Sequence, residues 1–150
     1  MNRKISKRNA ERGQSMVELA LSFTVLLFLL MGVVDLGRAY FAYSSMRDAA
    51  QEGAVYGSLY PLDGNGNFNS SGIINRVKSS SSTPVDLNDP FIRVDPSVVG
   101  TRICYGSGVR VDVYWDSFPL LFPFWEPLFG ISSVPIHARV EDTILRPPCK

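Results

Sequence analysis

The chain has 150 residues, the length of about one domain, and a formal net charge of +1. This near-neutral total excludes a generally basic protein, but the charge is unevenly distributed. Residues 1–13 carry five basic side chains and one acidic side chain, so their charge is +4 and that of the remaining residues is −3. A short basic block in front of an apolar segment is typical of a membrane-topology signal rather than of a nucleic-acid site.

An apolar segment follows this basic leader. Met16 to Val34 are nineteen residues in which Glu18 is the one charged side chain. As a helix they would span about 28 Å, close to the hydrocarbon thickness of a bilayer. A secretory signal peptide has a shorter apolar core that ends in small residues suited to cleavage, and the residues after Val34 lack that pattern. The sequence therefore predicts a retained single-pass helix, with the leader in the cytoplasm and the residues after Val34 outside.

The acidic residue inside this segment indicates a function. An ionisable group in a membrane is unfavourable unless it has a partner, and such a group is a functional hypothesis by default. Because Glu18 lies about one turn from the membrane interface, its side chain could also simply reach the headgroups. That second interpretation does not account for the run GQSMVE, residues 13–18, as a unit.

The run RGQSMVE, residues 12–18, followed by a long apolar helix, resembles the type IV pilin signal. More closely it resembles the TadE-like minor pilins (pseudopilins) of tight-adherence, or Flp (type IVc), pilus systems. The resemblance continues through residues 35–38 and 46–57, so in total it covers residues 12–57. Beyond residue 57 the chain is compatible with this family only at the level of architecture.

This resemblance implies that a prepilin peptidase in the membrane cuts between Gly13 and Gln14. In pilin families the glutamate, here Glu18, neutralises the new N-terminal ammonium of a neighbouring subunit as it joins the filament, and such a pair is strong in a low dielectric. The implied partners are the peptidase, other pilin subunits in a homo- or hetero-oligomer, the pilus assembly platform and membrane lipid, without nucleic acid or a cofactor. The mature protein would lie in a pilus or at the cell surface and serve adhesion or secretion. The alternative is an uncleaved single-pass anchor with an extracytoplasmic binding head.

We expect the helix to continue outside the membrane, since no proline occurs before Pro61. Ala49, Gly53 and Gly57 recur at four-residue spacing in this part, and such small residues let another backbone approach closely. The stripe could pack on the chain's own sheet or against other subunits, and we favour the first interpretation.

The expected architecture is α+β: a long N-terminal transmembrane and juxtamembrane helix with a small antiparallel sheet in a pilin-like head. The segments are the cleaved leader (1–13), the membrane half of the helix (14–34), its extracytoplasmic half (35–60) and the head (61–150). In the head we expect a short helix capped by Ser71. We also expect a hairpin of residues 101–105 and 109–115 around Gly106-Ser107-Gly108, and a later strand at 134–140. Alternation along these strands predicts a buried apolar face, made of Ile103, Tyr105, Val109, Val111, Val113 and Trp115 in the hairpin and of Val134, Ile136, Ala138 and Val140 in the later strand. The opposite, polar face of the hairpin would carry Arg102, Cys104, Arg110 and Asp112.

Two features of the C-terminal part leave alternatives open. Cys104 and Cys149 could form a disulfide in an oxidising compartment, with Cys104 facing away from the long helix, or they could be two unrelated thiols. The apolar, proline-containing stretch from Ser117 to Ile131 could fold over the core, or its aromatic side chains could contact lipid headgroups or another pilus component.

The sequence contains no convincing active site or metal site. His137, the one histidine, falls on the polar side of the strand expected at 134–140. No glycine-rich phosphate loop follows a strand, and no serine lies in a Gly-x-Ser-x-Gly elbow. The sequence therefore predicts a structural protein rather than an enzyme.

Overall fold

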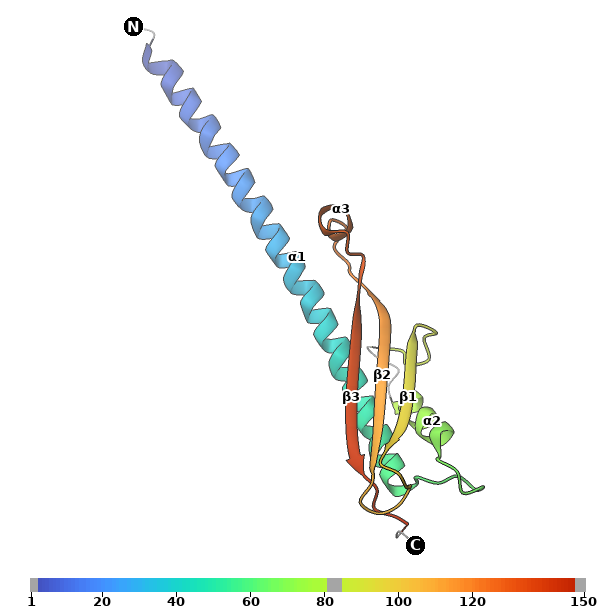
Figure 1. Cartoon of the computed structure of the whole chain (residues 1–150). Coiled ribbons are helices and arrows are strands. Elements are labelled where there is room, and N and C mark those ends of the chain that lie inside the picture. The colour runs from blue at the N-terminus through green and yellow to red at the C-terminus, as the bar shows by residue number, and fades with distance from the viewer. Residues whose placement is uncertain (1–2, 81–84, 148–150) are drawn as a thin grey trace. The chain divides into compact units, whose positions relative to one another are not determined.

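The computed structural model describes residues 3–80 and 85–147, with side chains described from residue 13 onward. The chain divides into two compact units, Met1–Gly37 and Arg38–Lys150. Along the chain the elements are α1 (Arg3–Leu59), α2 (Ser70–Ser80), β1 (Ile92–Val99), β2 (Gly108–Pro119), α3 (Trp125–Phe129) and β3 (Ser133–Thr143) (Figure 1). A long N-terminal helix and a three-stranded antiparallel sheet confirm the predicted α+β class.

Helix α1 is continuous over 57 residues because no proline interrupts it, and it ends directly before the first one. The Tyr60 amide still donates to the Tyr56 carbonyl at 2.9 Å, after which Pro61 cannot continue the pattern. The carbonyl of Ser58, in the last turn, accepts a hydrogen bond from the Leu145 amide at 3.0 Å. The C-terminal tail thereby satisfies one of the free carbonyl groups at the end of the helix.

The sheet of the second unit has the order β1-β2-β3, with β2 in the centre. Val109, Val111 and Val113 of β2 are fully buried, and the register sets Val113 opposite Val94 of β1 and Ala138 of β3. Since side chains alternate along a strand, the residues between these valines lie on the opposite face. The apolar alternation predicted for residues 109–113 and for 134–140 is therefore confirmed.

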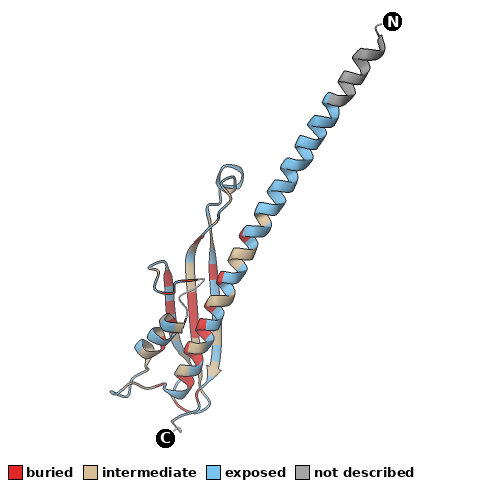
Figure 2. Cartoon of the chain, turned by 180° about the vertical axis from the view of Figure 1, so that it is seen from behind, coloured by how far each residue is buried: buried red, intermediate tan, exposed pale blue. Residues whose placement is uncertain are grey.

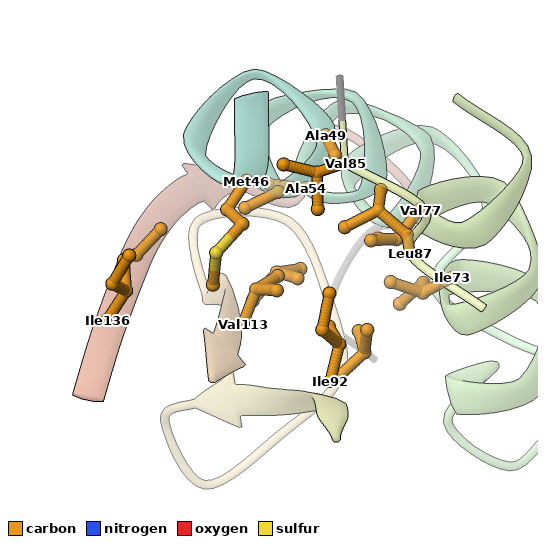
Figure 3. Packing of buried hydrophobic residues seen from close by; sticks show 14 of the residues in the cluster. Met46, Ala49, Ala54, Ile73, Val77, Val85, Leu87, Ile92, Val113 and Ile136 are labelled. Carbon is orange, nitrogen blue, oxygen red and sulfur yellow. The ribbon is translucent and has the colours of Figure 1, made fainter. Parts of the chain in front are cut away.

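The buried face of the sheet packs on the part of α1 that belongs to the second unit. Met46, Ala50 and Ala54 of the helix are fully buried there. Figure 3 shows side chains from α1, α2, the three strands and the connection before β1 in this core, among them Met46, Ala49, Ala54, Ile73, Val77, Val85, Leu87, Ile92, Val113 and Ile136. Figure 2 shows the same distribution, with buried residues on this half of the helix and on the facing strands.

The small residues of α1 lie against α2 and β2. A methyl group placed at Gly57 would lie 2.8 Å from Cδ1 of Ile73 and 2.9 Å from Cγ1 of Val109, both shorter than normal carbon contacts. At Gly53 it would overlap Cγ2 of Val77. The stripe at Ala49, Gly53 and Gly57 thus packs inside the head. This is the arrangement in which the stripe packs within its own chain rather than against other subunits.

The hairpin predicted around Gly106-Ser107-Gly108 is wrong. Residues 101–105 are not a strand, and β2 pairs instead with β1, in which Asp95 and Pro96 occupy the middle. Asp-Pro in sequence indicates a turn, but Pro96 is tolerated here because β1 is an edge strand. Tyr105, expected on the buried face, is 64% exposed.

The cap predicted for the short helix is off by two residues. Helix α2 begins at Ser70, and the Asn69 side chain, not that of Ser71, accepts a hydrogen bond from the Gly72 amide at 3.1 Å. The Asn69 side-chain amide also donates to the Tyr60 carbonyl at 3.2 Å, which ties the start of α2 to the end of α1.

The stretch from Ser117 to Ile131 does not fold over the core. Its first three residues belong to β2, and Phe118 is buried, but none of residues 120–131 is part of the core cluster among the residues the structure describes. They form the connection between β2 and β3, including α3 (Figure 1). The interpretation that this stretch folds over the core is therefore wrong.

The contact at Gly53 gives a test of the packing. A Gly53→Val substitution should destabilise the head by about 2–3 kcal/mol, because the added carbons overlap the buried, stiff side chain of Val77. Thermal unfolding of the full chain in detergent, followed by circular dichroism, measures this loss. Gly37→Val is the matched control, since nothing lies within 4 Å of a methyl group at Gly37. An equal effect of both substitutions would contradict the packing argument, whereas adding Val77→Ala to Gly53→Val should restore part of the stability.

Candidate functional site

The predicted cleavage position lies on an exposed part of α1. Gly13 and Gln14 are exposed, and a methyl group at Gly13 would meet nothing within 4 Å. Gly53 and Gly57 are explained by tight packing, but packing inside the chain does not require a glycine at position 13. A glycine in a helix interior is unfavourable by about 1 kcal/mol relative to alanine, so its presence here suits recognition by another molecule.

Polar side chains form a stripe on the helix next to this position. Gln14 and Ser15 lie four and three residues before Glu18, and Ser22 lies four residues after it, so all of them lie on the side of α1 that carries Glu18. Shallow depressions flank Glu18, one lined by Ser15 and Ser22 and the other by Gln14. Glu18 is exposed, and none of the salt bridges among the described residues includes it. Glu18 was predicted as a site residue, whereas no role was predicted for Ser22.

The helix around and beyond this stripe is largely apolar and exposed as far as residue 31. Side chains from residue 13 to residue 31 are all exposed, and the most apolar window of α1 has a mean hydropathy of 2.4 (Figure 2). Within the described part of the chain, α1 is the one helix long and apolar enough to cross a membrane. Large exposed apolar surfaces mark contacts with lipid or protein, so this helix fits a single-pass membrane anchor.

The structure describes one of the two cysteines of the predicted disulfide. Cys104 is 6% exposed and lies in the loop between β1 and β2, not on a strand, while Cys149 lies outside the described residues. The Tyr105 amide donates to the Pro147 carbonyl at 2.7 Å, so the chain comes close to residue 104 two positions before Cys149. The pairing of Cys104 with Cys149 stays a prediction.

A network of polar side chains covers the other face of the sheet. The Asp112 carboxylate is 9% exposed and lies at the centre of this network. It accepts a hydrogen bond from Arg139 Nε at 2.6 Å, and its Oδ1 lies 2.8 Å from His137 Nε2. The His137 ring stacks on Tyr114 with centroids 4.3 Å apart, and the Arg93 guanidinium lies over the same Tyr114 ring at 4.9 Å.

Sequence reasoning placed His137 and Asp112 on polar faces but did not bring them together. Their contact depends on the β2–β3 register, which sets Asp112 opposite Arg139 and Tyr114 opposite His137. A carboxylate that orients a histidine also occurs in catalytic triads, where the second ring nitrogen activates a hydroxyl or thiol. In the described part of the chain the hydrogen-bond partner of His137 is Asp112, and its ring is covered by Tyr114, so the cluster is suited to holding β2 and β3 together.

The environment of Asp112 shifts its pKa. Burial alone would raise the pKa, but the hydrogen bonds from Arg139 and His137 and the nearby positive charge outweigh that effect. The net pKa of Asp112 is therefore below its ordinary value. The same contact raises the pKa of Arg139.

None of the described residues forms a group of three or more histidine, cysteine, aspartate or glutamate side chains that could hold a metal ion.

The fold and the exposed apolar helix define a class of protein: a single-pass membrane anchor with a small α+β head. Comparison with family models narrows this class, because residues 13–55 match the family described as TadE-like protein. Residues 13–55 are thus similar to TadE-like proteins, and the resemblance found in the sequence is confirmed for that segment. Searches of curated proteins and of solved structures gave no match.

The lowered pKa of Asp112 predicts how the stability of the head depends on pH. A carboxyl group with a lowered pKa in the folded state stabilises the protein fully above the unfolded value, and this contribution is lost as pH falls through the folded pKa. We therefore expect the free energy of unfolding to decline below about pH 4. Asp112→Asn should lower it by about 1–2 kcal/mol at neutral pH and flatten the acid decline.

Thermal unfolding between neutral and acid pH, followed by circular dichroism, measures both effects. Asp95→Asn is the matched control, since Asp95 faces Asp112 in the register but its side chain is 69% exposed. The role of Asp112 would be contradicted if the free energies of unfolding of the wild type and of Asp112→Asn, plotted against pH, ran parallel at all pH values.

Proposed function

We propose that this chain is a minor pilin, or pseudopilin, of a type IVc (Tad or Flp) pilus system, cut by a prepilin peptidase between Gly13 and Gln14. The observation that carries the proposal is the TadE-like match, which begins at Gly13 and covers the exposed apolar helix. Its role is structural: the protein takes part in the assembly or initiation of a pilus for adhesion or secretion, and it catalyses no reaction.

The polar stripe supports a specific role for Glu18 in assembly. Cleavage after Gly13 would give Gln14 a free α-ammonium, four residues and about 6 Å of helix rise from Glu18. In lipid the Glu18 carboxylate and this ammonium are each unfavourable alone and favourable as a pair. A subunit whose ammonium meets the Glu18 of its neighbour is therefore displaced from it by about one helical turn, which fixes the register between adjacent helices.

The alternative function is that of an uncleaved single-pass anchor whose head binds a partner. In that case Glu18 would reach the headgroups and would need no ammonium. The two functions differ in the N-terminus of the mature protein, which begins at Gln14 in the first and retains the leader in the second. The N-terminal sequence of membrane-purified protein distinguishes them.

We expect Gly13→Ala to block processing, because the added methyl group hinders the approach of the protease to the carbonyl of residue 13, which it attacks. Intact-mass measurement of membrane-purified protein from cells with the peptidase would show retention of residues 1–13. Gly37→Ala makes the same change outside the motif and should be processed normally. If Gly13→Ala yields a mature protein beginning at Gln14, the assignment of the cleavage position is wrong.

We expect Glu18→Ala to be cleaved normally but to enter pili at least about tenfold less efficiently than the wild type, since the ammonium would lose its partner in lipid. Glu18→Gln keeps the shape and removes the charge, so an equal defect in both variants assigns the effect to charge. Ser22→Ala alters the same stripe without changing charge and serves as the control. Quantitative blotting of sheared pili measures incorporation, and wild-type levels for Glu18→Ala would exclude the pairing.

A further inference from the structure

The connection between β2 and β3 presents an apolar surface that the proposed function does not use. We name residues 120–131 the hairpin tip. Large apolar side chains of the tip are exposed by 44–63%, namely Leu121, Phe124, Leu128, Phe129 and Ile131. Glu126 is its single charged residue. A concentrated apolar surface of this kind marks a contact with lipid or with protein.

The tip has a defined internal structure. Trp125 lies at its centre, with its ring 5.6 Å from that of Phe122 and 5.5 Å from that of Phe129. Gly130 adopts the left-handed conformation that ends α3, and its amide donates to the Glu126 carbonyl at 2.8 Å. The Leu120 amide donates to the Ser132 carbonyl at 3.2 Å and closes the base of the tip. The aromatic rings therefore contact one another. Phe124 and Phe129 are exposed, while Phe122 and Trp125 are half-buried.

Contacts inside the second unit define the direction in which the tip extends. At one end of the head, Gly57 of α1 lies against Val109, near the start of β2. At the other end, the Arg38 guanidinium donates to the Pro119 carbonyl at 3.4 Å and lies 5.2 Å from the centroid of the Phe118 ring. Strand β2 therefore runs antiparallel to this part of α1, and the tip leaves the sheet at the Arg38 end.

The Arg38 end is also where the head is joined to the apolar helix. Val34 is the last residue of the apolar segment, and four residues of helix rise by about 6 Å, so Arg38 lies close to the level at which a membrane-spanning helix would leave the bilayer. Tyr40 and Phe41 of α1 are 68% and 65% exposed at this same end of the head. Aromatic side chains are enriched at membrane interfaces, where their rings contact both headgroups and acyl chains.

We propose that the hairpin tip inserts into the lipid headgroup region of the membrane leaflet from which α1 emerges. The rings of Phe124, Trp125 and Phe129 enter the interface, and the Glu126 carboxylate stays among headgroups and water. The head is then held at the membrane by both α1 and the tip. This inference rests on anchoring by the apolar helix but not on cleavage at Gly13.

Tryptophan fluorescence of the full chain in phosphatidylcholine vesicles tests this inference. The chain contains two tryptophans, so Trp115→Phe leaves Trp125 as the single reporter in the tip. Trp125→Phe is the matched control, since the remaining Trp115 packs against the core of the head. Subtracting the emission of this control from that of the wild type gives the Trp125 signal with Trp115 unchanged. Vesicle flotation establishes independently that each variant is anchored, and intact mass reports the state of the leader.

The expected result is that lipids brominated close to the headgroup quench Trp125 at least about twofold more than lipids brominated near the acyl-chain ends, while they leave Trp115 little affected. Phe124→Ser combined with Phe129→Ser should reduce this quenching. The proposal would be overturned if aqueous iodide quenched Trp125 and brominated lipid did not, in vesicles shown by flotation to carry the chain. Protection from both quenchers would also overturn it, because the tip would then be covered by protein such as a second copy of this chain.

Discussion

The close contact of α1 with α2 and β2 is the interaction on which the head depends. A three-stranded sheet with one apolar face must bury that face against another element, and the helix covers it. The contact is close because Gly53 and Gly57 have no side chain and because alanines occupy the neighbouring buried positions. The same small residues in a membrane helix would favour pairing with another helix. Here they are used inside the chain, so any contact between subunits must use other surfaces of α1.

Sequence reasoning succeeded where a single period or motif determined the answer. The apolar length of α1, the alternation at residues 109–113 and the motif at residues 12–18 were all readable without knowledge of which strands pair. It failed where the answer depended on which strands pair with each other. Strand β1 was missed because Asp95-Pro96 resembles a turn, and the residues predicted in its place became a loop. The Asp112 network could not be derived either, since the contacts of Asp112 with His137 and Arg139 depend on the register between β2 and β3, which alternation alone does not determine.

The site residues show the same division. Gly13 and Glu18 were predicted as site residues because a charge and a glycine are conspicuous beside an apolar run, whereas Ser22 is inconspicuous until the helix aligns it with Glu18. The hairpin tip was noticed for its composition, but composition could not decide between a buried connection and an exposed one. That decision required the direction of β2 relative to α1, which the contacts of Gly57 and Arg38 supply.

The antiparallel arrangement of β2 and α1 in the head also has a mechanical consequence. A force that pulls on α1 along its axis acts parallel to its interface with the sheet. Many side-chain contacts, from Arg38 at one end to Gly57 at the other, are then loaded in shear at the same time instead of being peeled apart one after another. The hydrogen bond from Leu145 to the last turn of the helix adds a further restraint at the far end. The head is therefore built to resist extraction of its own helix under tension.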